Sequence, residues 1–123
     1  MSERRGLGNY MDSIVQHGKY CFLCGKNGAQ DPLDEHHIFF GAGKRKTSEK
    51  YGLKVWLCHS ACHTTGPYAV HNNRETREYL EKAGQLAAMR YYHWTVDDFR
   101  KVFGKNYLGK RELKRLQGDI EDV

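Results

Sequence analysis

The four cysteines of the chain fall in two close pairs, and their spacing predicts a metal site. Two residues separate Cys21 from Cys24, and three separate Cys58 from Cys62. A tight turn can bring thiolates two to four positions apart to one ion, and thiolates favour zinc over magnesium or calcium. We therefore expect one structural Zn²⁺ held by all four cysteines. Both His59 and His63 flank the last cysteine, so a site of three cysteines and one histidine stays open.

A second group of residues that can bind a metal lies between and after the two cysteine pairs. Glu35, His36 and His37 stand in a row between the two cysteine pairs, His63 directly follows the second pair, and His71 lies eight positions further on. Neighbouring side chains on a strand point to opposite faces, so the two adjacent histidines cannot have the same role unless the strand bends. One can ligate a metal while the other takes a proton from an attacking water, for which a pKa near neutrality is suited.

Short strands are expected to position these side chains. The run Leu33–Phe40 ends in apolar residues typical of a strand, and Leu53–Cys58 is rich in β-branched and aromatic residues. The glycine-rich, basic segment Gly41–Lys46 between them predicts a flexible loop. The second strand runs directly into the second cysteine pair, which places the predicted zinc site at its end.

Two helices are expected to follow. One spans residues 74–92 and is capped by one of the two preceding asparagines, and a capping box of Thr95 and Asp98 opens a second that ends at Phe103–Gly104. Helical spacing predicts one buried stripe on the first helix. Its members are Tyr79, Leu80, Ala83, Leu86, Ala87 and Arg90.

The chain is short and polar for a folded protein. Its 123 residues are 39% hydrophobic, which allows one domain with a modest core that benefits from a metal staple. We expect a small α+β fold: an N-terminal arm or loosely docked turn over residues 1–17, a domain over 18–107 and a basic, then acidic, tail over 108–123. No apolar run is long enough for a membrane span, and the N-terminus lacks the apolar segment of a secretory signal. A reducing cytoplasm is therefore the expected compartment.

Positive charge is concentrated in two regions. The net charge is +5, with basic residues clustered between residues 40 and 54 and between residues 100 and 116. Such clusters suit contacts with the phosphates of DNA. No segment is typical of a base-reading helix, so we expect low sequence specificity. The candidate phosphate-binding residues are Lys44, Arg45, Lys46, Arg100, Lys101, Lys105, Lys110 and Arg111.

Taken together, these motifs resemble the HNH (His-Me finger) nucleases. The resemblance is carried by Cys-x2-Cys, Glu35-His-His-Ile, and an apolar strand that ends in Leu-Cys and leads to Cys-His. A longer match, with Ser48-Glu-Lys-Tyr-Gly-Leu-Lys-Val-Trp-Leu-Cys and Val70-His-Asn-Asn, is similar to phage-encoded members, among them recombination-enhancement nucleases that act with a bacterial recombinase. It covers roughly residues 20 to 107. The family's middle asparagine has no counterpart in Tyr51-Gly-Leu, and Asn72 or Asn73 are candidates to replace it.

The resemblance implies a ββα-metal core and a role for each histidine. His37 would be the general base, His36 and His63 ligands of a catalytic Mg²⁺ or Mn²⁺, and His71 a third ligand. Glu35 would orient an imidazole without itself contacting the metal. The implied function is a metal-dependent DNA endonuclease or nickase in phage recombination or processing, within the host cytoplasm. The alternative is a non-catalytic zinc module that binds nucleic acid or protein, and it has no need of the Glu-His-His run.

Overall fold

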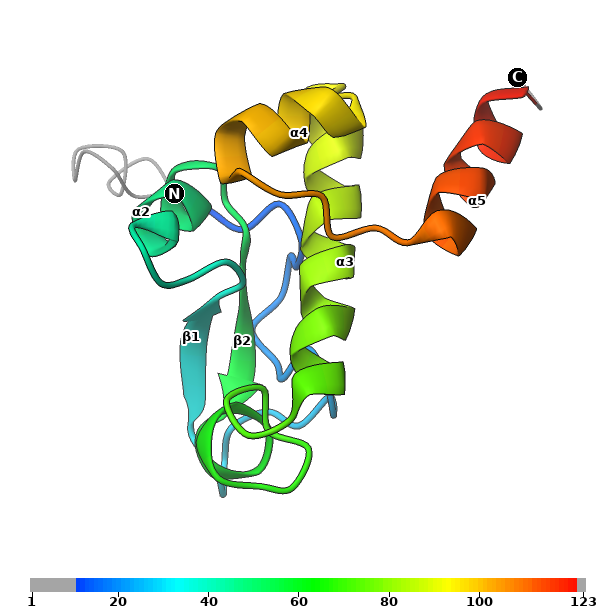
Figure 1. The fold of residues 1–123 in the computed structure, drawn as a ribbon. Helices are drawn as coiled ribbons and strands as arrows, with labels where there is room; N and C mark the ends of the chain where they lie inside the picture. Colours follow the sequence, from blue (N-terminus) through cyan, green and yellow to red (C-terminus); the bar gives the residue numbers. More distant parts are fainter. Residues whose placement is uncertain (1–10, 122–123) are drawn as a thin grey trace.

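The computed structural model describes the backbone of residues 11–121 and the side chains of residues 11–116. The first ten residues of the predicted arm and the last two of the predicted tail lie outside the described residues. Figure 1 shows a small α+β fold, which agrees with the predicted class. In chain order the elements are β1 (Leu33–His37), α2 (Lys44–Lys50), β2 (Lys54–Cys58), the short π-helix η1 (His59–Thr64), α3 (Arg74–Tyr92), α4 (Val96–Phe103) and α5 (Lys110–Glu121).

The two strands form an antiparallel sheet in which His36 lies opposite Val55 and His37 opposite Lys54. The second strand falls within its predicted range. The first lies at the start of the Leu33–Phe40 run rather than at its end. Ile38 N still donates to the carbonyl of Leu53, but Phe39 N donates to Ser48 Oγ, so the chain leaves the ladder there.

Helix α2 begins at Lys44, where a flexible basic loop was predicted. Only the glycine-containing part of that segment turns, with Ala42 and Gly43 at positive φ. Ser48, which is buried on α2, donates to the carbonyl of Leu53 and accepts from Phe39 N. The helix is thereby attached to the ends of both strands, which explains why the basic residues are ordered.

Helix α3 has the predicted bounds, and Asn73 caps it by accepting a hydrogen bond from Thr76 N at 3.0 Å. The predicted buried stripe is wrong except for Leu80. Tyr79 is 59% exposed, Arg90 is exposed, and the remaining members are half-buried. The face that packs inward consists of Leu80, Gly84, Gln85 and Ala88.

Small residues on that face explain the rotation of α3. A Cβ at Gly84 would lie 3.0 Å from Ile38 Cγ2 and 3.1 Å from Phe39 Cε2, so the helix touches the strand end more closely than a larger residue allows. Gln85 is buried but satisfied, because its side chain donates to Asn106 Oδ1 and accepts from Tyr107 N. A polar residue thus occupies the core face and ties the segment after α4 to α3.

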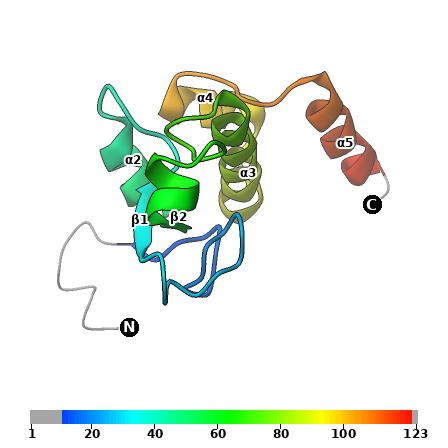
Figure 2. The same cartoon turned by 90° about the horizontal axis from the view of Figure 1, so that it is seen from below.

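Helix α4 begins with the predicted capping box of Thr95 and Asp98 and ends at Gly104, which has a φ of +82°. Phe99 and Phe103 are its buried residues. Residues 110–121 of the predicted tail form helix α5, which projects from the rest of the chain in both Figure 1 and Figure 2. A contact near its start is the ion pair of Lys82 with Glu112, at 3.3 Å.

Part of the predicted N-terminal arm is held against β2. Ser13 Oγ donates to the carbonyl of Lys54, and buried Gln16 accepts from Trp56 N through its side-chain oxygen. Residues 11–17 therefore belong to the folded unit, although they form no helix or strand. None of the helices within residues 11–121 combines the length and apolar character needed to cross a membrane.

Candidate metal centres

The structure brings all four cysteine sulfurs together. Cys21, Cys24, Cys58 and Cys62 lie with their sulfurs within 4.8 Å of one another, and Cys24 Sγ is 3.6 Å from Cys58 Sγ. The first pair sits on a turn in which Cys24 N donates to Cys21 Sγ at 3.4 Å. The second pair spans the junction of β2 and η1. Four thiols in this arrangement could hold a metal such as zinc.

The electrostatics of the thiols fit a bound cation. Burial and the neighbouring thiols of Cys24 and Cys21 raise the pKa of Cys58 to about 12, and the same causes raise the pKa of Cys62. Burial also disfavours the Cys21 thiolate, but hydrogen bonds from nearby backbone groups lower its pKa to about 7. Clustered thiolates repel one another without a cation, and a tetrahedral Zn²⁺ removes that repulsion.

The geometry separates His59 and His63 from the cysteine cluster. Nδ1 of His59 lies 2.6 Å from Asp34 Oδ2, and Nδ1 of His63 lies 2.8 Å from the same oxygen. Cys62, which either histidine could have replaced, is within the sulfur group. The four-cysteine set predicted first is thus the one that the fold assembles.

Three imidazoles form a second cluster. The ring centroid of His36 lies 5.2 Å from that of His63 and 5.3 Å from that of His71, and the last two rings are 4.8 Å apart. Each ring offers one nitrogen within 4.8 Å of the others. β1 supplies His36 and η1 supplies His63. These are the three residues that the resemblance implied as ligands of the catalytic metal.

Backbone pairing between η1 and the following loop positions His71. Val70 N donates to the carbonyl of Cys62, and His71 N donates to the carbonyl of His63, so the loop runs back along the end of η1. Asp31 accepts from Ser60 N and Ala61 N, both at 2.9 Å, and so holds the start of η1. No sequence motif marked Asp31, because its partners are backbone groups 29 and 30 residues away.

The buried ring of His36 is suited to a metal. Among the buried side-chain nitrogen and oxygen atoms of the described residues, Nε2 of His36 alone has no hydrogen-bond partner. Burial, together with the charges of His63, His71 and His37, lowers the pKa of His36 to about 3. The ring is therefore neutral across the physiological range, and a neutral imidazole ligates metals. An unpaired buried nitrogen is costly, and coordination would satisfy it.

Asp34 is a site residue that sequence reasoning missed. It lies two positions before His36, and its carboxylate accepts a hydrogen bond from Nδ1 of His63. Although burial raises its pKa, the hydrogen bonds from His63 and His59 lower it below the usual value, so the group is ionised. With Nδ1 donating to Asp34, His63 keeps the lone pair on Nε2 for a metal. The alternation of side chains along a strand was the signal that could have placed Asp34 beside His36.

We expect Asp34→Asn to weaken binding of Mn²⁺ to the histidine cluster by about 10- to 100-fold, the usual cost of losing a partner behind a metal ligand. The measurement is Mn²⁺ titration of zinc-loaded protein, followed by electron paramagnetic resonance. Glu35→Gln is the matched control, because Glu35 is a carboxylate on the same strand but on its other face. Equal losses in the two variants would contradict the role given to Asp34.

His37 lies on the opposite face of β1, with partners of its own. Its Nε2 is 2.7 Å from Oε1 of Glu49 on α2, and Glu49 Oε2 is 2.9 Å from the ammonium group of buried Lys54. Burial raises the pKa of Glu49, but the hydrogen bonds of His37 and Lys54 outweigh it and lower the pKa. An ionised Glu49 fixes the proton of His37 on Nε2 and leaves Nδ1 with its lone pair.

Glu35 was expected to orient an imidazole. Its Oε2 lies 3.4 Å from Nζ of Lys54, on the same face of β1 as His37. The carboxylates that hydrogen-bond to imidazoles are instead Asp34 for His63 and Glu49 for His37. Glu49 was also not predicted from the sequence, because its role depends on α2. That helix was not expected, since the glycine-rich segment at its start indicated a loop.

The two asparagines offered in place of the family's middle residue are engaged in the loop that precedes α3. Asn72 donates to the carbonyl of Gly66, and Asn73 donates to the carbonyl of Pro67 besides capping α3. Their contacts are structural. The position beside His36 and His63 is filled by the neighbouring His71.

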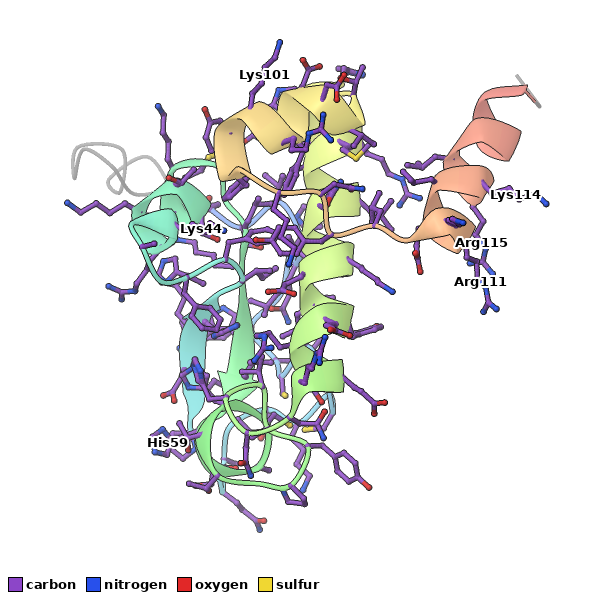
Figure 3. The ribbon with its side chains drawn as sticks, viewed as in Figure 1. Lys44, His59, Lys101, Arg111, Lys114 and Arg115 are labelled. Carbon is purple, nitrogen blue, oxygen red and sulfur yellow. The ribbon has the colours of Figure 1, made fainter. Side chains whose placement is uncertain are left out.

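The candidate phosphate-binding residues are spread over several elements. In Figure 3, Lys101 lies on α4, at the end of the molecule opposite to His59, and Arg111, Lys114 and Arg115 project from α5. Arg100 forms an ion pair with Asp97 at 2.9 Å. Arg45 and Lys46 are exposed on α2, and Lys110 is exposed at the start of α5. Lys44 and Lys105 line one surface hollow.

Comparison of the chain with protein-family models, with curated proteins and with solved structures finds no match in any of the three. The functional assignment therefore depends on the two clusters themselves: four thiols, and three imidazoles of which one has an unpaired buried nitrogen.

Proposed function

We propose that the chain is a metal-dependent DNA endonuclease or nickase of the HNH type, with low sequence specificity. The observation that carries the proposal is the unpaired Nε2 of His36, buried between two further imidazoles. The pairing of β1 with β2 and the position of η1 directly after β2 support this proposal, because a ββα-metal core consists of two strands and a helix. Phage DNA recombination or processing, alongside a bacterial recombinase, is the setting that the sequence resemblance suggests.

In this proposal the four cysteines have a structural role. They link the turn at residues 21–24 to the junction of β2 and η1, and so fix the position of η1 relative to the strands. His63 lies one residue after Cys62 on η1, so the same link holds it beside His36. A zinc ion bound by four thiolates has no open position for a substrate, which excludes it from the chemistry.

The histidine cluster would hold the catalytic ion. His36, His63 and His71 leave coordination positions open, and a bound Mg²⁺ or Mn²⁺ would stabilise charge on the scissile phosphate and on the leaving oxygen. His71 is exposed and His36 is buried, so a phosphate would approach from the side of His71. Asp34 keeps His63 in the tautomer that ligates.

The proposed general base is His37, whose Nδ1 would accept a proton from the attacking water. The strand alternation that separates His36 from His37 sets a condition on the substrate. β1 pairs only with β2 within the described residues, so its other edge has no strand partner. A phosphodiester that crosses this edge would meet the metal ligands on one side and His37 on the other. One such site cuts one strand, and a double-strand break requires a dimer or two events.

A non-catalytic zinc module is the competing function. It requires the four cysteines and a basic surface, but it gains nothing from three converging imidazoles or from a histidine held by Glu49, which is itself paired with buried Lys54. The unpaired buried nitrogen of His36 costs stability unless a ligand satisfies it. The histidine cluster therefore favours the nuclease.

Nicking of supercoiled plasmid tests the proposal. We expect nicking in Mg²⁺ or Mn²⁺ and none without added divalent ion, with His36→Ala and His71→Ala both inactive because each removes a ligand. His17→Ala is the matched control, since His17 is exposed and lies outside both clusters, and it should retain full activity.

Because His36 is buried, its variant is also checked for folding by circular dichroism and for zinc content. Because His71 is exposed, His71→Ala removes less packing and serves as the second variant. Nicking by wild-type protein that persists at the same rate in both variants would show a contaminating nuclease and would overturn the proposal. Absence of nicking from folded, zinc-loaded wild type on every DNA form would do so too.

A further inference from the structure

A surface groove of about 470 Å³ lies between the residues that follow β1, helices α2 and α3, and the segment after α4. This volume is within the range of roughly 300–1,000 Å³ that small-molecule sites occupy. A second hollow of about 270 Å³ shares Glu78, Glu81, Lys105 and Tyr107 with it and continues to Gly109, next to the start of α5. Because they share four lining residues, the two hollows adjoin each other along α3.

Phe40 connects the groove to the metal ligands. Its ring centroid lies 5.0 Å from that of His71 and 5.5 Å from that of His36, and it also lines the groove. The side chain follows the two fully buried residues Ile38 and Phe39, yet Phe40 itself is 36% exposed. The exposed surface of the Phe40 ring therefore lies next to two of the imidazoles proposed to bind the metal.

The charges that line the groove favour an anion. Four cations line it against two carboxylates. Arg74 and Glu78 are paired with each other at 2.9 Å, which leaves three cations and one carboxylate. Burial raises the pKa of the other carboxylate, Glu81. Further along the groove, Tyr107 lies under two ammonium groups, those of Lys44 at 5.9 Å and Lys105 at 5.1 Å from the ring centre. The cations are Lys44, Arg74, Arg77 and Lys105.

From these observations we propose that the groove binds an unpaired stretch of DNA next to the scissile phosphate, with a base stacked on Phe40 and phosphates held by Arg77, Lys44 and Lys105. This inference rests on the proposed nuclease function and names its substrate class. The chain is then a nuclease for DNA with a single-stranded segment at the cleavage point, rather than for continuous duplex.

The reason is the combination of an exposed aromatic ring with cations in one groove. Proteins that bind single strands combine a basic groove with aromatic rings, because an unpaired base exposes its π-face. In a duplex those faces are covered by neighbouring base pairs, so Phe40 would have nothing to stack on. A basic surface alone suits either form of DNA, and Phe40 is what distinguishes them.

Fluorescence anisotropy with zinc-loaded protein, without added Mg²⁺ or Mn²⁺, measures binding separately from cleavage. The probes are a dT 12-mer, a 12-mer of abasic sites with the same phosphates, and a 12-base-pair duplex. The variant is Phe40→Leu, which keeps an apolar side chain but removes the π-face. The matched control is Tyr91→Leu, because Tyr91 is an aromatic residue of α3 with 58% exposure that does not line the groove.

We expect wild type to bind the dT 12-mer more tightly than either other probe, and Phe40→Leu to weaken binding of the dT 12-mer by at least about fivefold. The effect of Phe40→Leu should vanish with the abasic strand, and Tyr91→Leu should match wild type throughout. Equal losses on the dT and abasic strands, or duplex bound at least as tightly as the single strand, would overturn this inference. Neither outcome depends on nicking, so failure of the nuclease proposal is detected separately.

Discussion

His37→Ala is expected to lower the rate of DNA nicking by about 10²- to 10⁴-fold, the usual contribution of a general base. The proposed mechanism gives His37 no contact with the metal, because its ring lies on the face of β1 opposite to His36. Binding of Mn²⁺ and of DNA should therefore be unchanged. The measurement is single-turnover nicking at saturating Mn²⁺, with Mn²⁺ affinity determined in parallel. This pairing distinguishes a lost base from a lost ligand.

Glu49→Gln tests the same site through a residue that contacts His37 and not the substrate. The charged Glu49 keeps the proton of His37 on Nε2, and an amide in its place can either accept from that nitrogen or donate to it, so both tautomers become populated. We expect a smaller loss of rate than in His37→Ala, again with unchanged Mn²⁺ affinity. Loss of Mn²⁺ binding in His37→Ala, comparable to the loss in His36→Ala, would show that His37 is a ligand and would contradict its assignment as the base.

The candidate site was largely predictable because its ligands are chemically distinctive and closely spaced. Thiol pairs with two or three intervening residues restrict the possible folds so strongly that the four-cysteine cluster follows from the sequence. Strand alternation likewise predicted the separation of His36 from His37. The supporting carboxylates escaped prediction because aspartate and glutamate are common on any surface. Asp34 and Glu49 acquire their roles only when η1 and α2 place His63 and His37 against them.

Features of the fold that depend on local sequence signals were predictable. Features that depend on tertiary packing were not. The capping box of Thr95 and Asp98 and the asparagine cap of α3 gave the starts of two helices, because both depend on hydrogen bonds to the adjacent backbone. The buried face of α3 depends instead on what it meets. Gly84 lets α3 contact Ile38 and Phe39, and the helix turns so that large residues such as Tyr79 point outward. A periodic pattern of apolar residues cannot reveal that a glycine is at the closest contact.

Removal of zinc is expected to have the largest effect on the fold itself. A structural site of four thiolates contributes on the order of 10 kcal/mol, while the net stability of a domain this size is about 5–15 kcal/mol. A strong chelator should therefore abolish the cooperative thermal transition seen by circular dichroism, and added Zn²⁺ should restore it. Wild-type protein should contain one tightly bound zinc per chain by elemental analysis.

Single substitutions connect this effect to the cysteine cluster. Cys24→Ser removes a ligand from an exposed position, so little packing is lost with it, and it should still reduce zinc affinity severely. Lys26→Ala is the matched control, since Lys26 is exposed in the same turn and has no ligand atom in the cluster. Replacing zinc by Co²⁺ gives thiolate charge-transfer bands, which should weaken in Cys24→Ser and persist in His36→Ala. A transition that is insensitive to chelation would mean that the sulfurs are not a metal site, and the histidines would then lack the link that holds η1 against the strands.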